Sequence, residues 1–357
     1  MRFNETPIRT AKNFNINNIK LENIEIPEAI TTFENITIIG DTSKINIEQN
    51  ADNTNTDLVY GLSNELTNQV KHGANQKIKL NINNTQNKKE KTEAEIDFKF
   101  DDENAALIDN IEITANENTK STVIIKYTSN QENESYHNGI IKAKAEKNSE
   151  LNIVVVNLMN TKSNNFLAIE NDFEENAKIN YTIVDFGGKH SITNYYSNLQ
   201  GDNCDNQLNT IYLGKENQVF DLNYIGELRG KKSNIDIEVQ GALKDISKKH
   251  FKGTIDFKKG CKKATGNENE ACMLLSDTAK SIALPMLLCS EEEVEGNHSS
   301  SAGKIGEKEL FYIMSRGFEL KEAMKLMVRA RFNQILEKIE KEELKNQIID
   351  EIEKRID

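Results

Sequence analysis

The sequence predicts a mainly β protein, built as a large sandwich or as a β-solenoid, with a small α-helical module at its C-terminal end. From residue 77 onward, short runs that alternate apolar and polar residues follow one another up to residue 257. Connections rich in Asn and Gly separate these runs, with almost no helical periodicity. After residue 303 the apolar residues recur at helical spacing instead. The boundary between the two patterns therefore lies near residue 303.

The strand-like runs are short and similar to one another, which favours the solenoid over the sandwich. They lie at residues 78–82, 94–100, 111–113, 123–127, 140–145, 151–156, 179–184, 209–213, 218–224, 235–239 and 251–257. The Asn-Gly and Asp-Gly signatures of tight hairpins are absent apart from a weak Asn138-Gly139. Asn at the ends of runs suits the tight corners of a solenoid, because Asn tolerates the left-handed backbone conformation better than most residues.

Residues 1–75 form a mixed N-terminal region in which the pattern is less regular. Isoleucines alternate with polar residues as in strands at positions 24, 26, 36, 38, 45 and 47. Residues 58–70 have the spacing of a short helix. We therefore divide the chain into this region, a β core over residues 76–302 and a helical module over residues 303–357.

The C-terminal module begins after a turn at Gly303–Gly306. Its first helix has an apolar face that includes Leu310, Phe311 and Met314, and Gly317 is placed to end it as a C′ glycine. Further helical faces follow at residues 323–330 and 344–356. The pattern predicts two or three helices with mixed charge on their exposed faces.

Composition narrows the classes of partner. The net charge of −12 disfavours nucleic acid, because phosphate is held by clustered Lys and Arg. The longest apolar run, Ile282 to Cys289, contains Pro285 and is too short to cross a membrane. The first residues carry no apolar stretch of the kind found in secretory signals, so we expect a cytoplasmic protein with reduced thiols at its four cysteines.

Several short motifs follow one another between residues 250 and 317. They are His250-Phe251-Lys252-Gly253, Leu274-Leu275-Ser276-Asp277, His298 followed by Gly303-Lys304-Ile305, and Leu310-Phe311-Tyr312-Ile313-Met314-Ser315-Arg316-Gly317. In this order and spacing they resemble the SufB/SufD family, the scaffold proteins of SUF-type iron–sulfur cluster assembly. Thr6-Pro7-Ile8-Arg9-Thr10 also resembles the start of short family members.

The resemblance implies a right-handed parallel β-helix whose C-terminal helices dock a SufC-like ABC ATPase. It also implies pairing with a SufB-like subunit, or with a second copy, through the ends of the β-helices. The docking surface would then consist of Leu310, Phe311, Tyr312, Met314, Arg316, Gly317 and Ala323. The alternative for these residues is ordinary helix packing and capping.

Two departures from the SufB pattern indicate a SufD-like member. Glu270 stands where the SufB branch has a cysteine, and Asn297-His298-Ser299 stands where that branch has a Glu-His-Glu cluster. The cysteine-rich N-terminal extension of many SufB chains is also missing from this sequence.

His298 and Cys272 are the candidate iron or cluster ligands. His298 lies near the acidic run Glu291–Glu295, at what the pattern predicts to be an exposed turn, and imidazole binds iron together with carboxylate or thiolate. Cys272 shares a strand face with Glu270, since residues two apart in a strand point the same way. The alternatives are a solvent-exposed or hydrogen-bonded structural histidine and an inert buried thiol.

The resemblance therefore implies a non-enzymatic scaffold that holds a transient iron–sulfur cluster, which it would share with its partner subunit. The sequence lacks GxxxxGK[ST], so ATP would bind only to the partner ATPase. One alternative is a cytosolic β-solenoid interaction protein without metal. Another is a β-helix polysaccharide lyase or hydrolase, but such an enzyme would need export and stacking aromatics, and the chain contains no Trp.

Overall fold

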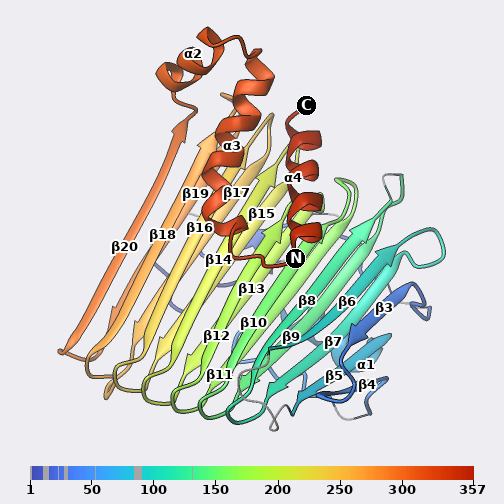
Figure 1. The fold of residues 1–357 in the computed structure, drawn as a ribbon, viewed down its shortest axis with the longest axis vertical. Coiled ribbons are helices and arrows are strands. Elements are labelled where there is room, and N and C mark those ends of the chain that lie inside the picture. The colour runs from blue at the N-terminus through green and yellow to red at the C-terminus, as the bar shows by residue number, and fades with distance from the viewer. Residues whose placement is uncertain are drawn as a thin grey trace.

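The computed structural model describes residues 2–10, 16–22, 24–27, 31–52, 54–83, 91–130 and 132–357. Within these residues, two nine-stranded sheets enclose a common core, and from β5 onward successive strands alternate between the sheets (Figure 1). Sheet I consists of β3 (Ile36–Gly40), β6 (Thr92–Phe100), β8 (Lys120–Ser129), β10 (Glu150–Leu158), β12 (Lys178–Asp185), β14 (Asp205–Gly214), β16 (Asn234–Leu243), β18 (Ala264–Leu274) and β20 (Val294–Lys304). Sheet II consists of β4 (Ile45–Gln49), β5 (Gln76–Ile82), β7 (Ala106–Ala115), β9 (Tyr136–Ala145), β11 (Asn164–Phe173), β13 (His190–Leu199), β15 (Val219–Leu228), β17 (Lys248–Phe257) and β19 (Lys280–Cys289).

The predicted parallel β-helix is confirmed, because neighbouring strands from β5 and β6 onward run parallel. A sandwich of hairpins would have given antiparallel neighbours. Each turn of the chain adds one strand to each sheet, so Glu150 lies beside Lys178 and Lys178 beside Asp205.

Asparagines shape the corners where the chain passes from sheet II to sheet I. Asn118, Asn148, Asn176 and Asn203 all adopt the left-handed conformation, with φ between 56° and 62°. Asn176 Nδ2 donates to Asn148 Oδ1 at 2.9 Å, so the corner residues also bond from one turn to the next. The role predicted for Asn at the corners is confirmed.

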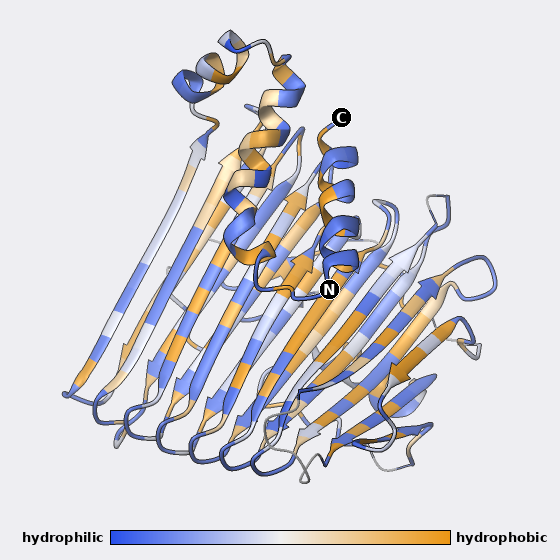
Figure 2. Cartoon of the chain, viewed as in Figure 1, coloured by the Kyte–Doolittle hydropathy of each residue, from blue (hydrophilic) through white to orange (hydrophobic). Residues whose placement is uncertain are grey.

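Alternate residues of each strand fill the space between the sheets, as period-two strands require. In β10, Leu151, Ile153 and Val155 point into this core and meet Leu167 and Ile169 of β11. Figure 2 shows the resulting alternation of hydrophobic and hydrophilic positions along the strands.

The outer face of sheet I is covered by two helices, α3 (Leu320–Leu336) and α4 (Glu342–Ile356) (Figure 1). Phe332 of α3 and Ile348 of α4 are fully buried against a cluster that includes Val184 and Ile211. α2 (Glu307–Ser315) precedes them and contains no buried residue. Among the described residues, no helix combines the length and apolar character needed to cross a membrane.

The N-terminal region covers sheet II. It contains β1 (Arg2–Phe3), which is antiparallel to β2 (Ile19–Lys20), and α1 (Asn64–Gly73). The ring of Phe3 stacks on that of Phe166, with centroids 5.5 Å apart. The strands predicted at residues 36–38 and 45–47 are present as β3 and β4, whereas Ile24 and Ile26 lie outside strands. The predicted helix over residues 58–70 begins only at Asn64, after the N-cap Ser63.

The two ends of the β-helix differ. At the N-terminal end, β3 runs antiparallel to β6 and β4 runs antiparallel to β5. At the C-terminal end, β19 and β20 form the last turn, and their outer edges pair with no strand of the described chain. The predicted turn at residues 303–306 is shorter than expected, because β20 continues through Lys304 and α2 starts at Glu307. We call the surface formed by β19 and β20 the open end.

Candidate functional site at the open end

His298 lies in the middle of β20, at the open end. The prediction of an exposed position is confirmed, but the residue belongs to a strand and not to a turn. In the parallel register His298 is the direct neighbour of Glu268 in β18. Neighbours in register share a face, so both residues belong to the column that lines the interior of the β-helix. The imidazole of His298 therefore lies one strand beyond the carboxylate of Glu268, in the last turn of the β-helix.

Glu268 is buried beneath this last turn, with only 2% of its surface exposed. Both of its carboxylate oxygens are buried and have no hydrogen-bond partner in the described chain. Burial, together with the neighbouring carboxylate of Glu270, raises the pKa of Glu268 to about 8. The sequence analysis did not single out this residue. The signal for it in the sequence is the spacing of Glu268 and Glu270, because residues two apart in a strand point to the same face.

Glu270 lies on the same face, and both of its carboxylate oxygens accept hydrogen bonds. Its Oε1 accepts from Lys249 Nζ at 2.7 Å and from Tyr212 Oη at 3.1 Å, and its Oε2 accepts from Ser300 Oγ at 2.8 Å. Lys249 and Glu270 are both completely buried. This network stabilises the carboxylate as an ion pair, in contrast to Glu268 two residues away.

Cys272 shares this face with Glu270, as predicted, and is buried. Burial is the main reason that the pKa of its thiol is raised. Its neighbour in β20 is Ala302, so the structure does not bring Cys272 opposite His298. Cys204 and Cys261 are buried elsewhere, and Cys289 is exposed at the end of β19. Within the described ranges, no three His, Cys, Asp or Glu side chains are grouped to hold a metal ion.

The motif at residues 250–253 serves both the core and the site. Phe251 fills the interior, and Lys252 pairs with Asp221 at 2.5 Å beneath the backbone of Asn4. Gly253 faces Glu268 across the interior, where a Cβ atom would lie 2.2 Å from Glu268 Oε2. A side chain at position 253 would therefore force the carboxylate of Glu268 to move.

The predicted docking residues on and after α2 are mostly exposed. Phe311 is 74% exposed, Tyr312 59% and Met314 40%. Arg316 lies over the ring of Tyr312 and donates to its hydroxyl at 3.1 Å. Gly317 has φ of 100°, so its predicted role as a C′ glycine is confirmed.

Two residues of the predicted docking set are less accessible. Leu310 is half-buried, and Ala323 is completely buried in α3. The side chain of Ala323 is therefore packed inside the protein and offers no surface to a partner. Figure 1 shows α2 beyond the tip of β20, beside the far end of α3 and off the face of sheet I.

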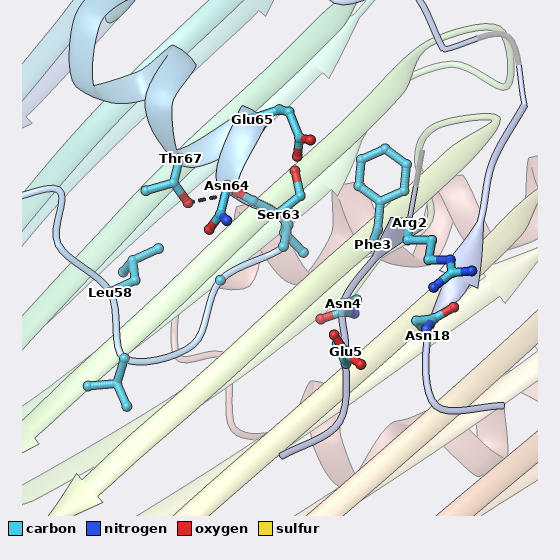
Figure 3. Close-up of a pocket in the computed structure, with 13 residues that line it drawn as sticks. Arg2, Phe3, Asn4, Glu5, Asn18, Leu58, Ser63, Asn64, Glu65 and Thr67 are labelled. Atoms are coloured by element: carbon cyan, nitrogen blue, oxygen red, sulfur yellow. Dashed lines mark hydrogen bonds between the residues drawn. The ribbon is translucent and has the colours of Figure 1, made fainter. Parts of the chain in front are cut away.

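A separate pocket of about 390 Å³ lies between β1 and the start of α1 (Figure 3). Its lining includes Asn4, Glu5, Ser63 and Glu65, and none of its lining residues is a histidine or a cysteine. None of the residues that line it belongs to the open end. The pocket is therefore not part of the candidate site.

Together, these features define a parallel β-helix with one open end and a projecting C-terminal helix, an architecture suited to assembly with other subunits. Residues 98–331 match the family model described as SUF system FeS cluster assembly, SufBD core domain. The chain therefore belongs to the SufBD family of iron–sulfur cluster assembly proteins.

Curated relatives agree with this membership. The chain is 27% identical over 180 residues to the iron-sulfur cluster assembly protein SufD of Bacillus subtilis, covering 50% of this chain and 41% of that protein. It is 32% identical over 167 residues to an iron-sulfur cluster assembly SufBD family protein of Pyrococcus horikoshii, covering 46% and 36%. It is 23% identical over 171 residues to SufD of Escherichia coli, covering 48% and 40%. The matched part thus spans about two fifths of these relatives, and the chain is SufD-like.

Proposed function

We propose that this chain is a non-catalytic scaffold subunit of a cytoplasmic SUF-type iron–sulfur assembly complex. In this proposal its open end pairs with a SufB-like subunit, or with a second copy, and α2 docks a SufC-like ABC ATPase, which alone binds ATP. Iron and sulfide are the cargo, held transiently between subunits. The observation that carries the proposal is the open end. There β19 and β20 are the edge strands of the two sheets, and no strand of the described chain pairs with their outer edges or covers the exposed His298.

Unpaired strand edges support pairing at this end. An exposed edge presents a row of free N–H and C=O groups, which proteins normally cover or pair. Another strand pair can continue both sheets there by β-augmentation. Such a contact would enclose His298 between the two subunits and bring it near donors from the partner.

The exposed aromatic residues of α2 support ATPase docking. A short helix with Phe311, Tyr312 and Met314 accessible can insert these side chains into a groove of a partner. Arg316 adds a cation held in place by Tyr312. Aromatic and Arg residues are the types that most often dominate binding energy at interfaces.

Phe311→Ala should weaken binding of the ATPase roughly 30-fold, because it removes an aromatic anchor worth about 2 kcal/mol. Calorimetry with the purified ATPase measures the change in Kd. Val59→Ala is the matched control, since Val59 is an exposed apolar residue far along the chain from α2. Equal affinity of the Phe311→Ala variant and the wild type would contradict docking through α2.

His298→Ala should lower the rate of cluster formation on the reconstituted complex roughly tenfold, because it removes an imidazole donor from the interface. The visible absorbance of the cluster after addition of iron and sulfide gives this rate. His72→Ala, an exposed histidine on α1, serves as the control. Unchanged cluster formation in a complex that still contains all its subunits would remove His298 from the site.

A further inference from the structure

Two of the four cysteines lie along the same edge of the β-helix, in its last two turns. Cys261 is in the corner that joins β17 to β18, and Cys289 is the final residue of β19, at the start of the next corner. Neighbouring strands of a sheet are about 4.8 Å apart, and a disulfide needs Cα atoms about 4.4 to 6.8 Å apart. The spacing between these two turns is therefore suited to a disulfide.

Both thiols face the interior of the β-helix. Cys289 is the register neighbour of Phe257, whose side chain belongs to the core between the sheets, and neighbours in register point to the same side. Cys261 is completely buried and belongs to the same core cluster as Phe257. Cys289 is exposed although it points this way, because β19 belongs to the last turn of the described chain.

The corner that carries Cys261 packs directly on the segment that follows Cys289. The backbone N–H of Gly260 donates to Glu291 Oε2 at 2.9 Å, and Cys289 Sγ donates to the carbonyl oxygen of Glu291 at 2.9 Å. Burial raises the pKa of the Cys261 thiol to about 11, and the nearby Glu291 and Cys289 add to this shift. The same short segment therefore holds both cysteines close to each other.

The corner that contains Cys261 is longer than its neighbours. It spans residues 258–264, whereas the matching corners of the turns before and after it span residues 229–233 and 290–294. Gly260 has φ of 106°, and no atom lies within 4 Å of the place that a Cβ would take. The extra residues let Cys261 fold back into the core, and the space around Gly260 lets the corner move when a bond forms.

We infer that Cys261 and Cys289 form a reversible disulfide when the protein meets an oxidant, and that this bond fastens the edge strand β19 to the preceding corner. Disulfides in cytosolic proteins are usually transient or redox-sensing. Cys204 lies two turns earlier along the same edge, and Cys272 lies near the opposite end of β18, so neither is placed to replace a partner. The inference does not depend on the proposed function, in which neither Cys261 nor Cys289 has a role.

A small disulfide such as oxidised glutathione is a sufficient oxidant. Cys289 attacks one sulfur of this reagent as a thiolate, the S–S bond of the reagent breaks, and one glutathione leaves and takes up the proton that Cys289 released. Cys261 then loses its proton and attacks Cys289 Sγ in the mixed disulfide, and the second glutathione leaves and takes up that proton. Two protein thiols are thereby oxidised to one disulfide, and one oxidised glutathione is reduced to two thiols.

The test is incubation of the purified chain with oxidised glutathione, followed by intact mass measurement and non-reducing peptide mapping. The wild type should lose two hydrogen atoms, link the peptides that contain Cys261 and Cys289, and melt about 5 °C above the reduced protein. Dithiothreitol should reverse all three changes. Cys204→Ser is the matched control, because Cys204 is a buried thiol in an earlier corner, and this variant should form the same bond as the wild type.

Cys289→Ser should form no bond within the chain, and Cys261→Ser should stop at the mixed disulfide, with one glutathione kept on Cys289. If Cys261→Ser does not fold, Cys289→Ser carries the decision, because an exposed side chain can be changed without loss of the core. A wild type that stays reduced or keeps glutathione on Cys289 would overturn the inference. A bond from Cys289 to another cysteine, or one between two chains, would overturn it as well.

Discussion

Replacing Phe332 with alanine should lower the free energy of unfolding by about 3 to 5 kcal/mol, the usual cost of deleting a buried aromatic ring. Phe332 is completely buried between α3 and sheet I, and its ring stacks on Phe186 with centroids 6.3 Å apart. The loss should appear first in α3 and α4, because these helices contact the β-helix through one apolar cluster.

Urea denaturation followed by circular dichroism measures this loss, and limited proteolysis locates it. Gln334→Ala is the control, since Gln334 lies on the exposed side of the same helix. Cleavage of the Phe332→Ala variant within residues 320–357 at protease levels that spare the control is the expected pattern. Uniform digestion of both proteins would show that the helices do not depend on this contact.

Asp185→Asn should make the protein more stable than the wild type at pH 8 by up to about 4 kcal/mol, and no more stable at pH 4. Asp185 lies in the interior, where it accepts from Ser191 Oγ and Asn157 Nδ2. Burial raises its pKa to about 7, and these bonds and the guanidinium of Arg355 only partly oppose the shift.

The direction of the pH effect follows from proton linkage. Between its ordinary pKa near 3.8 and the folded value near 7, the folded protein holds a proton that the unfolded chain releases. The wild type therefore loses stability as pH rises through this range, whereas the asparagine variant does not. Thermal melts of both proteins from pH 4 to pH 8 give the difference, and a constant difference across that range would contradict the assignment.

Local sequence patterns are enough to predict most of the fold. The period-two runs located the strands, and Asn at their ends gave the corners, because both depend on the backbone of a few consecutive residues. The same runs are compatible with a solenoid and with a sandwich, since the hydrophobic pattern of a strand does not reveal its neighbours. The resemblance at residues 250–317 supplied that information.

The site was predicted less completely. His298 was found through its motif, but its place in a strand was missed because the Ser- and Gly-rich run around it lacks apolar residues. The importance of Glu268 depends on what lies across the interior, namely Gly253, and that contact joins strands of different sheets. The sequence predicts Ala323 on an apolar helical face, but it does not show that this position is completely buried, because burial depends on how the helices pack.

The unlike ends of the β-helix limit how many chains can assemble through it. β3 and β4 run opposite to their neighbours, so the N-terminal edge cannot continue a parallel stack. Two chains that meet through β19 and β20 would each turn this reversed edge outward. Such a contact would use the same surface of both chains, so the pair would be closed and would leave no open end for a third chain.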